Sequence, residues 1–261
     1  MLELLFADGA PPAPLVVLPH LPGTGVEALV RPLFDCAPAI HRRVLPAPGV
    51  HAPTATVRRW YADLLWTLPA HERASLVLAS GPGAGCLATV ADRPVEVIAV
   101  VREPLEALAA LAAAGARLPK NRAPSELGQG KGSPKPWLRA VSNPQARALL
   151  VPWARPEEEL PVTWGPPPEA DRWRDLLVER MGEMRVVRDD ELPAVAHELA
   201  GRLGCPPDQR TRVAASVERL DERAQRIDHR LEYLRALNWL DVELYERSGA
   251  TASADAGGAA R

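Results

Sequence analysis

Short apolar runs alternate with helical patterns along the first half of the chain. Three runs are nearly continuous in apolar residues: 15–18, 75–79 and 95–101. Runs of this kind are typical of strands that are buried on both faces of a parallel sheet. Apolar residues recur at helical spacing over 26–34, 54–68 and 105–116. The alternation predicts an α/β fold, a P-loop-like central parallel sheet flanked by helices.

The second half of the chain predicts mostly helices. A helix over 171–181 is followed by a short strand at 184–187, and Asp189 or Asp190 is expected to cap a helix that ends before Gly204. A charged helical region over 208–247 carries an apolar stripe made of Val213, Val217, Leu220, Ile227, Leu231, Leu234 and Leu237. Its mixed charges favour a solvated face, and a helix that forms a homodimer is the alternative.

Proline- and glycine-rich stretches divide the chain. We expect a single α/β domain over 1–247 and a small, polar, disordered tail over 248–261. Within the domain, residues 117–136 predict a flexible loop and residues 152–168 a proline-rich connector. The chain has 28 prolines in 261 residues, about twice the usual share, which indicates many rigid loops.

Composition narrows the classes of protein that fit. The net charge is -2, which argues against a protein that coats nucleic acid. No apolar run reaches the roughly 18 residues of a membrane span, and the first residues lack the basic region of a signal peptide. Cys36, Cys86 and Cys205 are far apart without C-x-x-C spacing, so we expect no metal site, no disulfide framework and a reducing, cytoplasmic location.

The loop after the first predicted strand has the composition of an anion-binding turn. Pro22, Gly23, Thr24 and Gly25 lie between that strand and the first helix. A helix N-terminus offers unpaired N–H groups there, and glycines let the backbone approach a phosphate closely. The loop has no Walker A lysine, which disfavours a nucleotide kinase. A tight strand-to-helix turn with a purely conformational role is the alternative.

This loop also resembles a known motif. The segment 19–29 is similar to the H-I-P-K-T-G-G-T-S-L element with which carbohydrate-type sulfotransferases bind the 5′-phosphosulfate of 3′-phosphoadenosine 5′-phosphosulfate (PAPS). His20, Pro22, Thr24 and Gly25 match that element, whereas Gly23 stands at the position of its lysine.

A second segment, 98–108, resembles the family's strand that ends in L-R-D-P-V-E-R-V-L-S. Arg102 matches the arginine that binds the 3′-phosphate there, and Ala110 stands at the position of the serine that joins it. A guanidinium at the carboxyl end of a strand suits a bidentate grip on phosphate. The alternative for Arg102 is a salt bridge to Glu103 or Glu106 at a helix start.

Two further segments follow in the family's order. Residues 143–149 resemble its N-x-Q-T-R-x-L helix start, and residues 238–245 resemble its C-terminal N-x-x-D-x-x-L-Y-E-Y helix. The resemblance therefore touches segments from about residue 15 to residue 247, in matching order and spacing.

The resemblance implies transfer of a sulfuryl group from PAPS to a hydroxyl or amine of a small molecule or glycan, without a metal. Pro22, Gly23, Thr24 and Gly25 would hold the 5′-phosphosulfate and Arg102 the 3′-phosphate. His20 is the candidate base. Separately from the resemblance, all three lysines of the chain lie in the loop over 117–136, so Lys131 is a candidate to close over the nucleotide, and a solubilised linker is the alternative.

The departures from the family pattern favour a different class of function. The lysine and serine positions are Gly23 and Ala110, and residues 79–85, after the predicted strand at 75–79, contain no histidine where the family often has its base. Loss of one preorganised donor costs about 10²–10³ in rate, and loss of a general base costs roughly 10²–10⁴. The alternative is therefore a catalytically inactive sulfotransferase-fold protein that serves as a binding or assembly module.

Overall fold

The computed structural model describes most of the chain. The described residues are 2–7, 15–36, 40–45, 56, 59, 77–81, 95–119, 136–150, 160–221 and 233–258. Residues 56 and 59 are helical, and the rest of the helix predicted over 54–68 lies outside the described residues. Most of the predicted loop over 117–136, with Lys131, also lies outside them, as does the first part of the predicted connector over 152–168.

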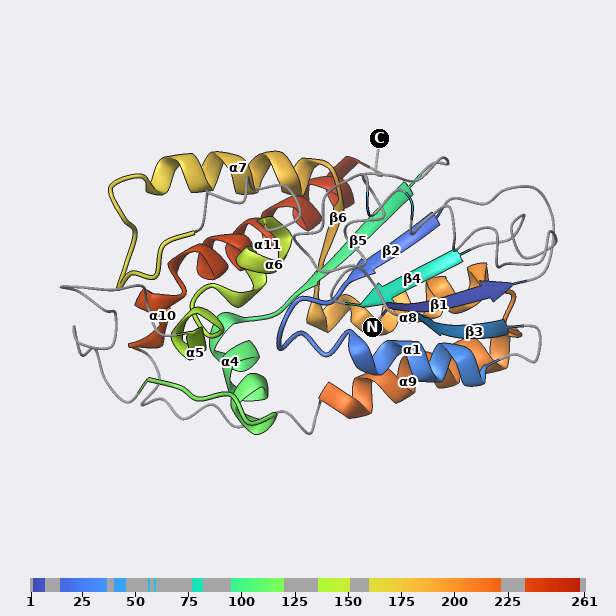
Figure 1. The fold of residues 1–261 in the computed structure, drawn as a ribbon. Helices are drawn as coiled ribbons and strands as arrows, with labels where there is room; N and C mark the ends of the chain where they lie inside the picture. Colours follow the sequence, from blue (N-terminus) through green and yellow to red (C-terminus); the bar gives the residue numbers. More distant parts are fainter. Residues whose placement is uncertain are drawn as a thin grey trace.

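The centre of the molecule is a mixed sheet of strand order β3-β1-β4-β2-β5-β6 (Figure 1). Its strands are β1 (Leu2–Ala7), β2 (Leu15–Pro19), β3 (Ile40–Leu45), β4 (Val77–Gly81), β5 (Val95–Val101) and β6 (Arg185–Arg188). β4, β2, β5 and β6 run parallel, whereas β1 pairs antiparallel with both β3 and β4. The α/β class is therefore confirmed, and the expected parallel sheet is corrected to a mixed sheet in which β1 runs antiparallel to both of its neighbours.

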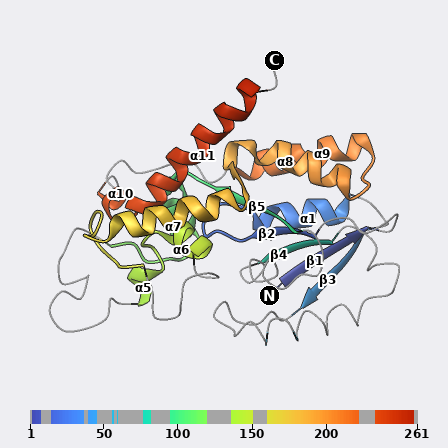
Figure 2. The same cartoon turned by 90° about the horizontal axis from the view of Figure 1, so that it is seen from above.

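Helices cover the two faces of the sheet (Figures 1 and 2). The helices are α1 (Glu27–Asp35), α4 (Pro104–Ala113), α5 (Pro136–Arg139), α6 (Pro144–Leu150), α7 (Ala170–Gly182), η3 (Asp189–Glu191), α8 (Leu192–Arg202), α9 (Pro207–Asp221), α10 (Leu234–Leu237) and α11 (Trp239–Gly258). α1, α8 and α9 pack together, and α6, α7 and α11 form a second group.

Alternate residues of β5 face opposite helical layers. Ile98 and Val100 belong to the apolar cluster with α1, α8 and α9. Ala99 and Val101 belong to the cluster with α6, α7 and α11. All four are fully buried. A strand covered on both faces needs no polar positions, which explains why the run over 95–101 is nearly continuous in apolar residues.

Most predicted elements of the second half are confirmed, with three corrections. Neither Asp189 nor Asp190 caps α8, because Glu191 stands at its N-cap and makes no side-chain hydrogen bond to the helix. The region over 208–247 is divided among α9, α10 and α11 instead of presenting one stripe. α11 continues to Gly258, beyond the boundary predicted at 247, and Ser248 is buried.

Gly204 ends α8 as predicted. Its φ is 81°, and its N–H donates to the Gly201 carbonyl at 3.0 Å. The Cys205 N–H donates to the Ala200 carbonyl at 2.9 Å. This pair of bonds is a Schellman motif, which requires a left-handed residue and therefore favours glycine.

Cys36 and Cys205 form a disulfide, contrary to the expectation from cysteine spacing. The two cysteines are 169 residues apart in sequence, so only the packing of α1 on α8 brings them together. In the described parts of the chain, no helix has the length and apolar character needed to cross a membrane.

Candidate functional site

The candidate site lies where the carboxyl ends of β2 and β5 meet. These strands are parallel neighbours. The chain leaves β2 toward α1, which packs with α8 and α9, and leaves β5 toward α4, which packs with α10 and α11 (Figure 1). Adjacent strands whose connections diverge to opposite faces form a topological switch point, where open α/β sheets bind ligands.

The turn after β2 is closed by its own hydrogen bonds. The Thr24 N–H and hydroxyl both donate to the Leu21 carbonyl, at 3.3 and 2.8 Å. Thr24 is buried, Pro22 is half-buried and His20 lies half-buried just after the strand. Gly23 and Gly25 have φ of 83° and 76°. The turn needs both glycines for its backbone conformation, which agrees with the conformational alternative for this loop.

Gly23 lies directly against α4. A Cβ added there would overlap the Ala107 carbonyl oxygen and would lie 2.9 Å from the Ala107 carbonyl carbon and Cα. No Cβ fits at that distance from a helix backbone. At Gly25, by contrast, an added Cβ would meet nothing within 4 Å. The position that the resemblance assigns to a lysine is therefore closed to every side chain in this backbone conformation.

The N-terminus of α4 is already occupied by a carboxylate. Glu103 is the N-cap, and its Oε2 accepts hydrogen bonds from the N–H groups of Leu105 and Glu106 at 2.8 and 3.0 Å. Its Oε1 lies 2.7 Å from Nη2 of Arg235. The N–H groups with which a helix start would bind a phosphate are thus satisfied from within the chain.

Arg102 is held by two carboxylates. Its Nε lies 3.3 Å from Glu106 Oε2 and 3.2 Å from Asp189 Oδ2. The exposed fractions of the side chains are 4% for Arg102, 9% for Asp189 and 37% for Glu106. Asp189 follows β6, which lies on the other side of β5 from β2. The alternative of a salt bridge from Arg102 to Glu106 is therefore confirmed, and Asp189 joins it.

A buried polar cluster fixes the backbone of Arg102. The Arg102 N–H donates to Gln145 Oε1 at 2.8 Å, and Gln145 Nε2 donates to the Arg102 carbonyl at 2.9 Å. Gln145 is on α6, and the N–H groups of Gln145 and Ala146 donate to Asp241 of α11 at 3.2 and 2.7 Å. Gln145 and Asp241 therefore join β5, α6 and α11.

Burial has the largest effect on the pKa of the Asp241 carboxyl. It raises the pKa of this carboxyl from 3.8 to about 7, against the opposing effect of the two backbone N–H groups and of the nearby Arg147. The carboxyl lies at the start of α6, where the helix dipole also favours its negative form. Its function in the fold is to cap α6.

One asparagine caps α11, and a second orders the segment before α6. Asn143 Oδ1 accepts from the N–H groups of Leu240 and Asp241 at 2.8 and 3.2 Å. Asn238 Oδ1 accepts from the Asn143 N–H at 2.8 Å. Asn143 has a φ of 47°, a conformation that asparagine tolerates better than most residues. The N-x-Q and N-x-x-D segments are thus one interlocked unit, here called the amide clasp: Asn143, Gln145, Asn238 and Asp241.

The structure brings part of the predicted site together. The turn over Pro22–Gly25 contacts α4, whose first residues follow Arg102 directly. The Arg102 guanidinium, however, pairs with Asp189 beyond β5. Lys131 lies outside the described residues. Sequence reasoning did not find the roles of Asp189 or of the amide clasp, because each role depends on a contact distant in sequence.

Comparison with known proteins gives no further assignment. No family model, no curated protein and no solved structure matches this chain significantly. Among the residues that the structure describes, no group of histidine, cysteine, aspartate and glutamate side chains is arranged to hold a metal ion.

Proposed function

We propose that this chain is a sulfotransferase-fold protein that lacks sulfuryl transfer and serves as a binding or assembly module. The resemblance of four colinear segments supports the fold. The observation that carries the functional part is the Arg102–Asp189–Glu106 ion-pair group, in which the arginine that would bind the 3′-phosphate is 4% exposed and already paired.

Charge makes this arrangement unfavourable for an anionic nucleotide. A phosphate at the Arg102 Nε would have to displace Asp189 or Glu106 and would then lie close to the carboxylate that remains. Two negative charges at about 4 Å repel by roughly 4 kcal/mol in the environment near a protein surface. Reopening the buried ion pair would add to this, because a buried charge that loses its partner is strongly destabilising.

The turn after β2 supports the same proposal. A lysine at the position of Gly23 would supply the positive charge that sulfuryl transfer needs, but its Cβ would overlap the backbone of α4. The absence of that lysine is therefore more than the exchange of one side chain, because the backbone of α4 leaves no room for any side chain at this position. The turn packs against α4 in an arrangement that only glycine permits.

A second candidate function is PAPS-dependent sulfuryl transfer to a hydroxyl or amine of a small molecule or glycan. It is favoured by the switch point between β2 and β5 and by the N-terminus of α1, whose N-cap Val26 makes no side-chain hydrogen bond. On this hypothesis Pro22, Gly23, Thr24 and Gly25 hold the 5′-phosphosulfate, Arg102 holds the 3′-phosphate, His20 is the base and Lys131 closes the site.

A thermal-shift titration with 3′-phosphoadenosine 5′-phosphate distinguishes the two functions. A ligand at 100 times its Kd stabilises by about 2.7 kcal/mol, which raises Tm by roughly 5–10 °C for a chain of this size. The proposal expects no shift at millimolar nucleotide. A dose-dependent rise that disappears in Arg102→Lys, which keeps the positive charge but loses the planar fork, would establish the second candidate.

Glu106→Gln is the matched variant for this experiment. It removes one of the two carboxylates from Arg102 at a partly exposed position and leaves the amide clasp intact. If the carboxylates are what exclude the nucleotide, this variant gains a measurable Tm rise that the wild type lacks.

A homodimer through 208–247 remains a separate proposal. Val213, Val217, Leu234 and Leu237 of its apolar stripe already pack inside the chain, so sedimentation is expected to give a monomer.

A further inference from the structure

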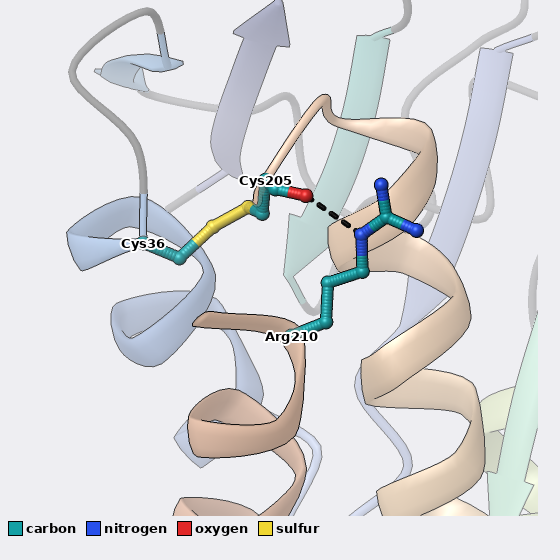
Figure 3. Close-up of a disulfide and its surroundings, with 3 residues drawn as sticks. All are labelled: Cys36, Cys205 and Arg210. Atoms are coloured by element: carbon teal, nitrogen blue, oxygen red, sulfur yellow. Dashed lines mark hydrogen bonds between the residues drawn. A yellow bond between two sulfur atoms is a disulfide. The ribbon is translucent and has the colours of Figure 1, made fainter. Parts of the chain in front are cut away.

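We propose that the Cys36–Cys205 disulfide is a redox-sensitive tie that controls how firmly two sides of the candidate site are held together. Cys36 is the C-cap of α1, and Cys205 follows the glycine that ends α8 (Figure 3). Their Cα atoms are 5.9 Å apart, within the range that a disulfide spans without backbone movement. The inference does not depend on which ligand the site binds.

Both cysteines are buried and hydrogen-bonded through their backbones. Cys205 is fully buried and Cys36 is 5% exposed. The Cys205 N–H is bonded in the Schellman motif, and its carbonyl accepts from Arg210 Nε of α9 at 2.6 Å (Figure 3). The Cys36 N–H donates to the Leu33 carbonyl at 3.3 Å. The pair is therefore positioned by three helices and not by flexible loops.

Each of the two joined helices begins at the candidate site. α1 starts two residues after Gly25, and α8 starts directly after the short η3 helix that contains Asp189. Because a helix is rigid along its axis, a tie at the far ends of α1 and α8 also restrains their near ends. In the disulfide form, the Gly23–Gly25 turn and the carboxylate on Arg102 keep one relative position.

Apolar packing also joins these helices. Leu29, Val30 and Leu33 of α1 and Leu192, Val195 and Leu199 of α8 belong to one buried cluster. Side chains in such a cluster resist separation, but they allow the small sliding movements that packed helices make during domain closure. Reduction therefore loosens the site without unfolding the domain.

The redox step is thiol–disulfide exchange with a low-molecular-weight disulfide such as oxidised glutathione. One cysteine thiolate attacks a glutathione sulfur, forms a mixed disulfide and releases one glutathione thiolate. The second cysteine thiolate then attacks the protein sulfur and releases the other glutathione. The protein loses two protons and two electrons, and one glutathione disulfide becomes two glutathiones. Because both sulfurs are buried, exchange requires opening at the end of α1.

Hydrogen–deuterium exchange on the full chain in a Cys86→Ser background tests the proposal. The redox state is first fixed with oxidised glutathione or dithiothreitol and confirmed by alkylation under denaturing conditions and intact mass. We expect reduction to speed amide exchange at least tenfold at 19–30 and 189–195. The amide clasp, at 143–150 and 238–245, is the internal control and should be unchanged.

The double variant Cys36→Ala/Cys205→Ala should exchange like the reduced protein under both conditions. If that variant does not fold, a glutathione titration of the Cys86→Ser protein decides, because exchange at 19–30 and 189–195 must change at the same midpoint as the thiol content. Free thiols at both positions after oxidation would overturn the disulfide. Equal exchange in two confirmed redox states would overturn the coupling.

Discussion

Gln145 and Arg102 exchange two hydrogen bonds, between the side-chain amide of one and the backbone of the other, although they are 43 residues apart in sequence. An amide side chain that donates and accepts at the end of β5 continues the hydrogen bonding of the strand where the sheet itself ends. These two bonds hold the backbone of Arg102 in place independently of the partners of its guanidinium. The same Gln145 is in the first turn of α6, so the end of the strand and the start of the helix are positioned together.

Replacing Gln145 with leucine should destabilise the protein by about 2–4 kcal/mol. The N–H and carbonyl of Arg102 would be left buried without these bonds, and each unsatisfied group costs about 1–3 kcal/mol. Urea unfolding followed by circular dichroism measures the change. Gln209→Leu on α9 is the matched control: Gln209 Oε1 is buried and accepts no hydrogen bond among the described residues, so its removal should not destabilise the protein by more than about 0.5 kcal/mol. Equal effects of the two substitutions would contradict the role of Gln145.

Asp241 should make stability depend on pH in the direction opposite to that of an ordinary carboxylate. Its pKa in the folded protein is about 7, above the 3.8 of the free side chain, so the native state binds the proton more tightly than the unfolded chain does. The stability that it contributes is greatest below about pH 4 and declines by roughly 4 kcal/mol as the pH rises to 7.

The variant Asp241→Asn tests this titration. At pH 5 the wild-type carboxyl is protonated and both of its oxygens can still accept, whereas the NH2 group of asparagine cannot accept from the N–H groups of Gln145 or Ala146, so the variant should be less stable than the wild type at that pH. The difference in unfolding free energy should shrink as the pH is raised from 5 to 7, because only the wild type loses stability from this group. Parallel pH profiles for the two proteins would show that Asp241 does not titrate in this range.

The ion pair between Arg102 and Asp189 should act as a unit. Arg102→Met alone is expected to cost about 3–5 kcal/mol, since it leaves Asp189 buried without this cation, and Asp189→Leu should cost less, because Arg102 keeps its pair with Glu106. The double variant should be more stable than either single variant, because neither charge remains buried. Denaturant unfolding of the four proteins of this cycle measures the coupling.

Glu106→Gln provides the control for that cycle. The Glu106 side chain is partly exposed, so its pair with Arg102 is screened by water and its loss should cost at most about 1 kcal/mol. Additive effects of the Arg102 and Asp189 substitutions would be incompatible with a buried pair.

Gly23 and Gly25 should respond differently to alanine. Both have positive φ, which costs an alanine roughly 1–2 kcal/mol. Gly25→Ala should cost no more than that, because its Cβ would point into open space. Gly23→Ala should cost at least about 2 kcal/mol more, since its Cβ overlaps the Ala107 backbone. Comparing the unfolding midpoints of the two variants measures the difference, and equal costs would mean that the turn does not pack on α4.

The sequence by itself determined the regular elements of this protein. The apolar runs predicted β2, β4 and β5, because a strand buried on both faces requires side chains of one kind. Helical periodicity located α1, α4, α7 and α8, and Gly204 marked the end of α8 because only a residue that tolerates positive φ closes that turn. Each of these signals acts over a few neighbouring residues and can therefore be read locally.

Only the tertiary structure decided how those elements serve the candidate site. β1 and β3 were missed because their pairing with distant strands, more than their own composition, makes them strands. The partner of Arg102 could be Glu103, Glu106 or a phosphate until the fold placed Asp189 beside it. Likewise, Cys36 and Cys205 meet only because α1 packs on α8. Contacts between residues far apart in sequence depend on where whole elements pack, and no local pattern records that.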